Sequence, residues 1–380
     1  MLVERSLSQQ GLPPGFLATP SLASSNKKSV LRRFVAALPG LLRSTVVVSA
    51  YAYPVVLAVV VLALRYVGEG YWMTALALFL PRVGFALPLP FLVVGLLVIR
   101  RRELLVTQLV AGLLVLFPLM GLVLPGSSGE KPGESKLRVL SFNVDSGWAG
   151  YDTLCERIFE QSPDIVAIQE AGGDQGKLVK VLSTRYPHVL ASTQFVLASR
   201  YPIRETTDPE KLPYYDRKRS PRFLRHSIET PLGMLTLFNV HPISPRGVLQ
   251  VHRGRAALVL LKRGELFEGE PSRDVAYNAG LRSLQIASVG QMAREERDPV
   301  VVVGDLNLPS LSPTLARSFA PFSDGFSASG SGFGYTFPAK FPFLRLDRIL
   351  TNDRLRVTRF DVGCKGLSDH FCVVADLQKK

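Results

Sequence analysis

The chain has 380 residues, of which 45 are basic, 31 are acidic and 47% are hydrophobic. This composition excludes a disordered chain and a disulfide-rich mini-protein, and long uncharged apolar stretches exclude a fully soluble protein. The net charge of +14 is unevenly spread, because residues 1–129 hold 11 Lys/Arg and 3 acids (+8) while residues 130–380 hold 34 and 28 (+6). The first part therefore predicts a membrane region, and the second a mixed-charge globular domain.

The apolar stretches predict about three membrane helices, preceded by a cytoplasmic, partly disordered segment at residues 1–44. A helix rises about 1.5 Å per residue, so a run of about 20 uncharged residues matches a hydrocarbon core of about 30 Å. The middle stretch contains Arg82, which would cost about 2.5–3.5 kcal/mol at mid-membrane, so the span is expected after it. Pro88 and Pro90 are expected to kink that span. The three expected spans are residues 45–64, 83–99 and 104–124.

Basic residues predict the orientation of these spans, because cytoplasmic loops collect Lys and Arg. The two basic clusters are Lys27, Lys28, Arg32, Arg33 and Arg43 before the first span, and Arg100, Arg101 and Arg102 between the second and third. Both are cytoplasmic only if three spans exist, which puts the C-terminal domain on the extracytoplasmic side of a plasma or inner membrane. With two spans and an interfacial middle stretch, the domain returns to the cytoplasmic side. A cleaved signal peptide is not expected, because the charged leader is too long.

Residues 125–135 have the composition of a linker, and residues 136–380 alternate β-branched runs with amphipathic helices. The expected strands are Leu137–Val144, Ile165–Ile168, Phe195–Ser199, Arg222–Glu229, Met234–Val240, Val300–Gly304, Arg345–Leu350, Val357–Val362 and Phe371–Ala375. The expected helices are Tyr151–Gln161, Gly254–Leu266 and Leu281–Arg294. This pattern predicts an α/β (α+β) fold, with two packed β-sheets flanked by helices, preceded by the N-terminal transmembrane helical region.

Polar residues collect where the expected strands begin or end. They are Asn143, Asp145, Glu170, His241, Asp305, Asn307, Asp347, Asp369 and His370. Burying such groups is costly unless they are paired or metal-bound, so a shared site at one rim of the sheets is expected. Carboxylate and amide oxygens suit Mg²⁺, whereas two histidines without nearby cysteine do not suit a structural zinc site. A base, a cation and donors for a phosphate together favour phosphodiester hydrolysis.

Each of these residues also fits a structural role when it is taken singly. Asn143 could cap a strand end, Asp305 could form an Asx turn, and Asp347 could pair only with Arg345 or Arg348. The joint pattern favours a shared site over these separate roles. Three cysteines show no metal-binding spacing, and free buried thiols are favoured over a Cys364–Cys372 bridge, which an extracytoplasmic domain would allow.

The ordered motifs resemble the endonuclease/exonuclease/phosphatase superfamily over about residues 136–376. The motifs are LRVLSFNVD (137–145), PDIVAIQE (163–170), LASRYPI (197–203), FNVHP (238–242), VVVGDLN (301–307), LDRIL (346–350) and SDH (368–370). Any one of them is weak, but seven in order are a strong signal. The resemblance implies a four-layer sandwich, with two central sheets flanked by helices and the site at one end.

The resemblance also implies a metal site for Mg²⁺ or Mn²⁺ and a set of catalytic residues. Glu170 would be the principal ligand, with Asn143 and Asp145 alongside and Asp369 near the metal. The catalytic set would be Asp305, to orient or deprotonate the attacking water, Asn307, to hold that water or a phosphate oxygen, His241, to donate to the phosphate, and His370, with Asp347 to fix its tautomer. The base is not assigned uniquely.

The motifs indicate the reaction but leave the substrate open. A membrane-anchored nuclease-like phosphodiesterase and an enzyme acting on a phospholipid headgroup or phosphorylated metabolite both remain, and a catalytically silent scaffold is less favoured because every matched position is present. Residues 214–225 carry five basic residues beside three aromatic ones, which fits a polyanion contact, although a solvated loop is favoured. The expected partners are a phosphodiester substrate and the lipid bilayer, and no protein partner is predicted.

Overall fold

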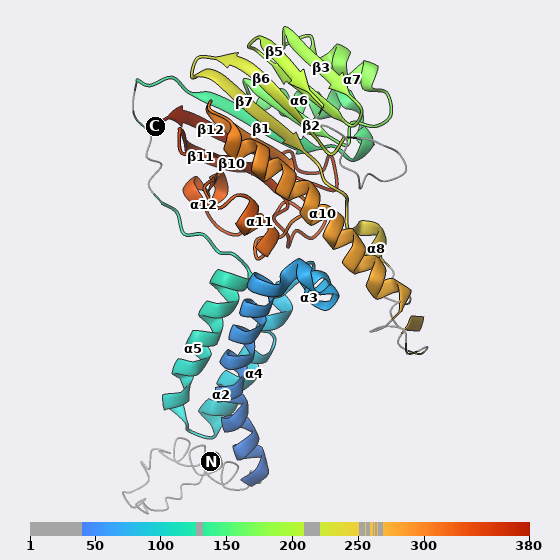
Figure 1. Ribbon diagram of the computed structural model, residues 1–380. Helices are drawn as coiled ribbons and strands as arrows, with labels where there is room; N and C mark the ends of the chain where they lie inside the picture. Colours follow the sequence, from blue (N-terminus) through green and yellow to red (C-terminus); the bar gives the residue numbers. More distant parts are fainter. Residues whose placement is uncertain are drawn as a thin grey trace, which may run out of the picture.

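The computed structural model describes residues 40–126, 131, 133–208, 221–250 and 269–380, together with residues 255, 259, 260, 262 and 264. A globular part with two β-sheets sits on one end of a helical bundle, and the described N-terminal residues begin at the far end of that bundle (Figure 1). Three expectations fall outside the described residues: the N-terminal disorder, most of the helix at 254–266, and most of the basic segment at 214–225.

Each sheet has six strands and contains one parallel pair. The first sheet runs β11 (Leu355–Gly363), β12 (Cys372–Lys379), β1 (Leu137–Asn143), β2 (Ile165–Gln169), β4 (Phe195–Ser199) and β3 (His188–Ser192). The second runs β5 (Ile203–Thr207), β6 (Phe223–Thr230), β7 (Gly233–Val240), β8 (Val300–Asp305), β10 (Asp347–Thr351) and β9 (Ser323–Asp324). The parallel pairs are β1 with β2 and β7 with β8, and every other neighbouring pair is antiparallel.

The alternation of side chains along each strand builds four layers. On β8, Val301 and Val303 enter the core between the sheets, whereas Val300 and Val302 face the outer helices. The outer helices are α6 (Tyr151–Glu160) and α7 (Gln175–Leu182) on the first sheet, and α10 (Glu270–Glu295) and α11 (Pro313–Ser318) on the second. Two short helices, α8 (Arg246–Gln250) and α12 (Gly325–Ser329), lie in connections. The predicted two-sheet α/β architecture is confirmed.

The register of the central strands brings the polar strand ends to one rim. Asn143 at the end of β1 pairs with Gln169 on β2, and Asp305 at the end of β8 pairs with Asp347 on β10. Gly304 allows this rim to close, because its φ is +136° and a Cβ there would lie 1.9 Å from the carbonyl oxygen of Val240. The glycine is therefore a packing requirement of β8 against β7.

The helical region runs up, down and up beneath the globular part (Figure 1). Its segments are α2 (Gly40–Leu62), η1 (Ala63–Val67), η2 (Gly68–Gly70), α3 (Trp72–Ala77), η3 (Arg82–Ala86), α4 (Pro88–Val98), η4 (Arg102–Leu104), α5 (Leu105–Leu114) and η5 (Val115–Leu119). The helical stretches Gly40–Gly70 and Arg102–Leu119 are long and apolar enough to cross a membrane, and Arg82–Val98 is shorter. By length and composition alone, they suggest a membrane anchor weakly.

Arg82 and the two prolines start the descending helix and do not interrupt it. The guanidinium of Arg82 donates to the carbonyl oxygens of Leu119 (2.8 Å) and Leu78 (3.1 Å), at the end of the bundle next to the globular part. Pro88 is the first residue of α4 and Pro90 lies in its first turn, where their missing N–H groups cost little. The two prolines therefore stand at the change from the η3 turn to α4 and not in the interior of the helix.

Close contacts hold the three helices together. A Cβ on Gly95 of α4 would lie 3.2 Å from Val46 on α2, so the glycine permits a close approach. Gln108 of α5 is buried and donates to the carbonyl oxygen of Ala50 on α2 at 3.1 Å. Small residues and an interhelical hydrogen bond of this kind favour association of apolar helices.

The structure corrects the expectation for the cysteines. Cys364 and Cys372 form a disulfide with Cα atoms 5.3 Å apart, and Cys155 is free and buried. The reason lies in the register, because Gly363 at the end of β11 pairs with Cys372 at the start of β12. The returning chain thus places the two cysteines side by side. All nine expected strands are present, while β3, β5 and β9 were not expected.

Candidate active site

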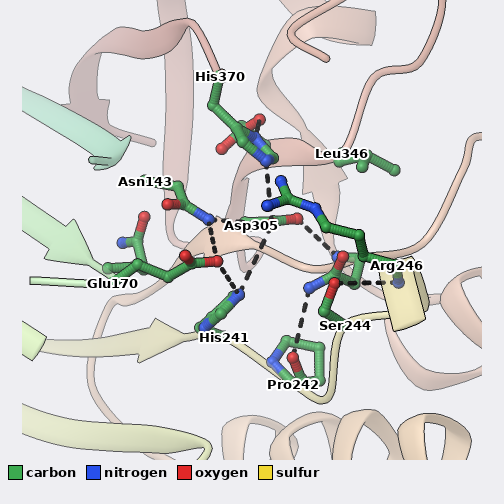
Figure 2. A network of polar contacts seen from close by, with 12 residues as sticks. Asn143, Glu170, His241, Pro242, Ser244, Arg246, Asp305, Leu346 and His370 are labelled. Carbon is green, nitrogen blue, oxygen red and sulfur yellow. Dashed lines mark hydrogen bonds and ion pairs between the residues drawn. The ribbon is translucent and has the colours of Figure 1, made fainter. Parts of the chain in front are cut away.

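A carboxylate and a histidine meet where the two parallel strand pairs end. Glu170 follows β2 with a left-handed φ of 52°, which turns its side chain across the rim. Its Oε1 accepts a hydrogen bond from Asn143 Nδ2 at 3.0 Å and lies 3.1 Å from His241 Nε2 (Figure 2). The side chains of three strand ends therefore converge from both sheets.

The carboxylate of Asp305 lies between the two histidines of the site. Its Oδ2 is 3.8 Å from His241 Nε2 and 3.6 Å from His370 Nε2, and it accepts a hydrogen bond from Asn143 Nδ2 at 3.3 Å. Its Oδ1 accepts the backbone N–H of Asn307 at 2.8 Å. Burial raises the pKa of Asp305, against the lowering effect of the charge on His370. A carboxylate held in this way is suited to accept a proton.

The pair formed by Asp347 and His370 lies on the far side of Asp305. Asp347 begins β10 and is fully buried, and its Oδ2 lies 2.8 Å from His370 Nδ1. Two backbone N–H groups, those of Leu346 and Asp347, donate to Thr336 Oγ1 and hold the start of the strand in place. The ring of Phe337 packs against the imidazole of His370, with centroids 4.6 Å apart. His370 therefore presents Nε2 to the site.

The surroundings of His370 and Glu170 shift the pKa values of both groups. Burial lowers the pKa of His370, but the nearby carboxylates of Asp347 and Asp305 outweigh it and raise the pKa to about 10. Burial raises the pKa of Glu170, but the nearby imidazole of His241 and the hydrogen bond from Asn143 outweigh it and lower the pKa to about 2. At neutral pH, the site therefore combines a charged imidazolium with an ionised carboxylate.

The donor atoms fit a divalent cation. Glu170, His241 and Asp305 each offer one ligand atom, and these atoms lie within 4.8 Å of one another. His241 Nε2 is buried without an aligned hydrogen-bond partner. Its Nδ1 lies 2.6 Å from Oε1 of Gln194, whose amide nitrogen donates to the carbonyl oxygen of Pro221 at 3.1 Å. Since this orients the amide, Nδ1 carries a proton and donates it to Gln194, which leaves Nε2 facing the two carboxylates.

The remaining predicted residues lie around the same centre. Asp145 follows β1, its backbone N–H donates to Asn143 Oδ1 at 3.1 Å, and burial with the charges of Asp369 and Glu170 raises its pKa. Asn307 Nδ2 donates to the carbonyl oxygen of Pro242 at 3.3 Å. All nine predicted residues thus come together at one rim. Glu170 belongs both to the predicted metal ligands and to the group of three possible ligands described above.

Two further residues of the site, Gln194 and Arg246, were not predicted from the sequence. Gln194, in the turn before β4, orients His241. Arg246, which begins α8, forms an ion pair with Asp369. Neither lies in a motif, and their only signal was a position in a connection next to an expected strand. Their roles become visible only when strands from the two sheets are brought together.

A cavity of about 230 Å³ opens beside these groups. Its polar side is formed by Glu170, Asp305, Asn307, Asp369 and His370, together with Ser244 and Arg246. A volume of this size accommodates a phosphoryl group with a small part of the molecule attached to it.

Solved structures that superpose on part of this chain have low sequence identity to it. An endonuclease/exonuclease/phosphatase from Bacteroides vulgatus is 16% identical with a TM-score of 0.48, covering 65% of this chain and 100% of that chain. One from Beutenbergia cavernae DSM 12333 is 17% identical with a TM-score of 0.46 (64% and 72% covered). Truncated Caenorhabditis elegans TDP2 is 17% identical with a TM-score of 0.46 (64% and 98% covered).

A search of curated protein sequences found no significant match to this chain. The model of the Endonuclease/Exonuclease/phosphatase family matches residues 140–370, which is more than half of the chain and contains every predicted site residue. The chain belongs to the endonuclease/exonuclease/phosphatase family.

Proposed function

We propose that this protein is a membrane-anchored phosphodiesterase that depends on a divalent metal ion and hydrolyses a phosphodiester by attack of water. One observation carries the proposal: the buried Nε2 of His241 lacks an aligned hydrogen-bond partner and faces the oxygens of Glu170 and Asp305, next to the charged His370. This arrangement combines a cation site, a proton acceptor and a phosphate donor. A catalytically silent scaffold would have no need to keep these costly buried groups.

The metal would be Mg²⁺ or Mn²⁺, held by Glu170 with Asn143, Asp145 and Asp369 nearby. Glu170, His241 and Asp305, whose ligand atoms lie close together, offer a second possible set of ligands that shares the carboxylate of Glu170. A bound divalent ion supplies positive charge, which polarises the phosphoryl oxygen and lowers the pKa of a bound water.

The side chains of this chain would handle the proton and the phosphate. Asp305 would orient the attacking water and accept its proton, and Asn307 would hold the water or a phosphate oxygen. His370, charged and oriented by Asp347, would donate a hydrogen bond to the phosphate and stabilise the charge that develops on it. His241 would use Nε2 toward the cation or, once protonated, toward a second phosphate oxygen.

The proposal is tested with the full-length protein in detergent and a generic diester, bis(4-nitrophenyl) phosphate. We expect nitrophenolate release that requires added Mg²⁺ or Mn²⁺ and stops with a chelator. If purified, folded protein releases no nitrophenolate with either metal, the proposed function is wrong. Heating curves with and without metal provide an independent check, because an ion that binds the folded state raises the unfolding temperature.

Substituting Asp347 by asparagine is expected to shift the pH dependence of hydrolysis. The raised pKa of His370 keeps the imidazolium charged through neutral pH, and its stabilising effect is fully present below the ordinary pKa of 6.5 and lost as pH rises through about 10. Without the carboxylate, the alkaline limb of the kcat profile should move to lower pH by about one unit or more. Asp353→Asn, at an exposed aspartate, is the matched control, and equal profiles for both variants would refute the role of Asp347.

We further propose that residues 45–124 cross the membrane three times, that residues 1–44 are cytoplasmic, and that residues 136–380 form an extracytoplasmic catalytic domain after the linker. Arg43 lies in the first turn of α2 and Arg100–Arg102 lie where α4 gives way to η4, and Figure 1 shows the start of α2 and the connection from α4 to α5 at the end of the bundle away from the globular part. Basic residues at one end of the bundle support this orientation. A reporter enzyme that works only outside the cytoplasm should be active when it is fused after Lys136, whereas a reporter that works only in the cytoplasm should be inactive. A signal only from a cytoplasmic reporter would overturn this orientation.

A further inference from the structure

The cavity beside the catalytic rim has an apolar side that the proposed hydrolysis does not use. It is formed by Phe79, Leu249, Phe337, Leu344 and Leu346, which line the same cavity as the polar groups of the site, and Phe337 also packs against His370. A phosphate and its attacking water need donors, acceptors and a cation, none of which an apolar side chain supplies. The two sides of the cavity therefore fit a substrate that is polar at one end and apolar at the other.

One residue of this apolar side comes from the helical region. Phe79 lies between α3 and η3, is 3% exposed, and falls outside residues 140–370 that match the family model. Its ring lies 5.5 Å from the guanidinium carbon of Arg282, a buried residue of α10. Arg282 is held in turn by Asn278 Oδ1 at 2.7 Å and by the carbonyl oxygen of Ile243 at 3.3 Å. The globular part thus fixes the position of Phe79.

Polar contacts fix the whole connection that carries Phe79. Glu69 is buried, and its Oε2 accepts hydrogen bonds from the backbone N–H (3.4 Å) and the hydroxyl (3.2 Å) of Thr314 at the start of α11. Gly68 packs so closely that a Cβ there would lie 2.2 Å from the ring of Pro313. The helical region therefore contributes Phe79 to the lining of the cavity, and these contacts hold Phe79 at a fixed distance from the catalytic groups.

The apolar side of the cavity is continuous with the interior of the helical bundle. One cluster of buried apolar residues extends from Leu57 and Leu64 in the ascending helix, through Leu78 and Phe79, to Leu344 and Leu346 beside the cavity. An apolar part of a substrate that contacts Phe79, Leu344 and Leu346 in the cavity leaves water, and each methylene buried there favours binding. A nucleic acid would instead need a basic track for successive phosphates. Among the described residues that line the cavity, Arg246 is the one arginine or lysine, and it is paired with Asp369, while the charge of His370 serves a single phosphate.

We infer that the substrate is a membrane phospholipid, with its phosphodiester at Asp305 and His370 and its apolar part against Phe79, Leu344 and Leu346. The inference builds on the proposed function and names the substrate class of that site. Water adds its oxygen to phosphorus, the bond from phosphorus to one ester oxygen breaks, and the departing alcohol takes a proton. No oxidant or other co-reactant is consumed. Phe79 contacts the apolar part and sets the preference for lipid.

A series of acyl-chain lengths on the full-length enzyme tests the inference directly. Short-chain diacyl phosphatidylcholines, used below their micelle concentrations, should inhibit hydrolysis of bis(4-nitrophenyl) phosphate competitively. The inhibition constant should fall with each added methylene, by up to about fourfold if the methylene is fully buried. Inhibition constants that do not depend on chain length would overturn the inference, and this measurement needs no variant.

Phe79→Ala gives the second arm, with Phe85→Ala as its matched control. Phe85 belongs to the same apolar cluster and is partly buried, but it does not line the cavity. We expect the ratio of kcat/KM for phospholipid vesicles to kcat/KM for the nitrophenyl diester to fall at least tenfold in Phe79→Ala, mainly through KM, and to stay within about twofold in Phe85→Ala. The dependence on chain length should weaken in Phe79→Ala alone. Equal changes in both variants would contradict a specific role for Phe79.

The outcomes separate this inference from the proposed function. Wild-type protein that hydrolyses neither the nitrophenyl diester nor any phospholipid with Mg²⁺ or Mn²⁺ would refute both. Hydrolysis of the nitrophenyl diester and of a single-stranded oligonucleotide, with no hydrolysis of phospholipid vesicles, would refute the lipid inference and leave the phosphodiesterase in place. Release of a headgroup or a phosphorylated headgroup from the vesicles supports both.

Discussion

Asp305→Asn is expected to lower kcat for phosphodiester hydrolysis by at least about 10²-fold at saturating Mg²⁺ or Mn²⁺. An amide has nearly the same shape as the carboxylate but cannot accept a proton from water and carries no charge for a cation. The carboxylate also lies 3.6 Å from His370 Nε2 and 3.8 Å from His241 Nε2, so its loss affects both sides of the site.

The fold should tolerate this substitution. The amide oxygen can still accept the backbone N–H of Asn307, which is 2.8 Å from Oδ1, although its nitrogen would then face Asn143 Nδ2 and lose one hydrogen bond worth about 1 kcal/mol. Removing a buried charge offsets this loss. Asp361→Asn, at an exposed partner of Arg359, is the control. Turnover within about twofold of wild type in folded Asp305→Asn would eliminate Asp305 as the proton acceptor.

Glu170→Gln should weaken metal binding and activity together. The carboxyl of Glu170, with its pKa lowered to about 2, is ionised throughout the physiological range and is the group shared by both candidate ligand sets. The neutral amide is a poorer ligand for a hard cation. We expect kcat/KM to fall at least about 10²-fold and the dissociation constant for Mn²⁺ to rise at least about tenfold.

Metal titration and activity assays together distinguish this effect from misfolding. Mn²⁺ binding to the purified protein is followed by calorimetry, and hydrolysis is assayed over a range of metal concentrations. Glu160→Gln, at an exposed residue of α6 that pairs with Arg157, should leave both quantities unchanged. If Glu170→Gln binds Mn²⁺ as tightly as wild type, the metal lies elsewhere.

The central strands and the rim they share could be predicted from sequence because their signals are local. Runs such as Val300–Gly304 are continuously apolar, since both faces of a central strand are buried, and each ends in a polar residue that must find a partner. The parallel pairing then places those ends at one edge. Local patterns do not predict which strand ends lie together, and this prediction came from the resemblance of the ordered motifs to a known family.

The elements that were missed have weak local signals. In β3 (His188–Ser192) and β5 (Ile203–Thr207) no residue is fully buried, because both are edge strands, and their polar residues look like those of a loop. The disulfide depends on the pairing of β11 with β12, and the contact of Gln194 with His241 depends on the packing of one sheet on the other. The contact of Phe79 with the cavity joins two regions that the sequence presents as separate domains, and no pattern along the chain reports such a contact.

The place of β12 in the first sheet constrains how the protein is made. This strand, Cys372–Lys379, is not at an edge but lies between β11 and β1, and its Leu377 pairs with Leu137, which comes 240 residues earlier in the chain. The first sheet therefore cannot close until β12 has left the ribosome, and Asn143 and His370 cannot come to the same rim before then. Until β12 is available, β1 has an open edge, and the nascent chain has to avoid aggregation during this interval.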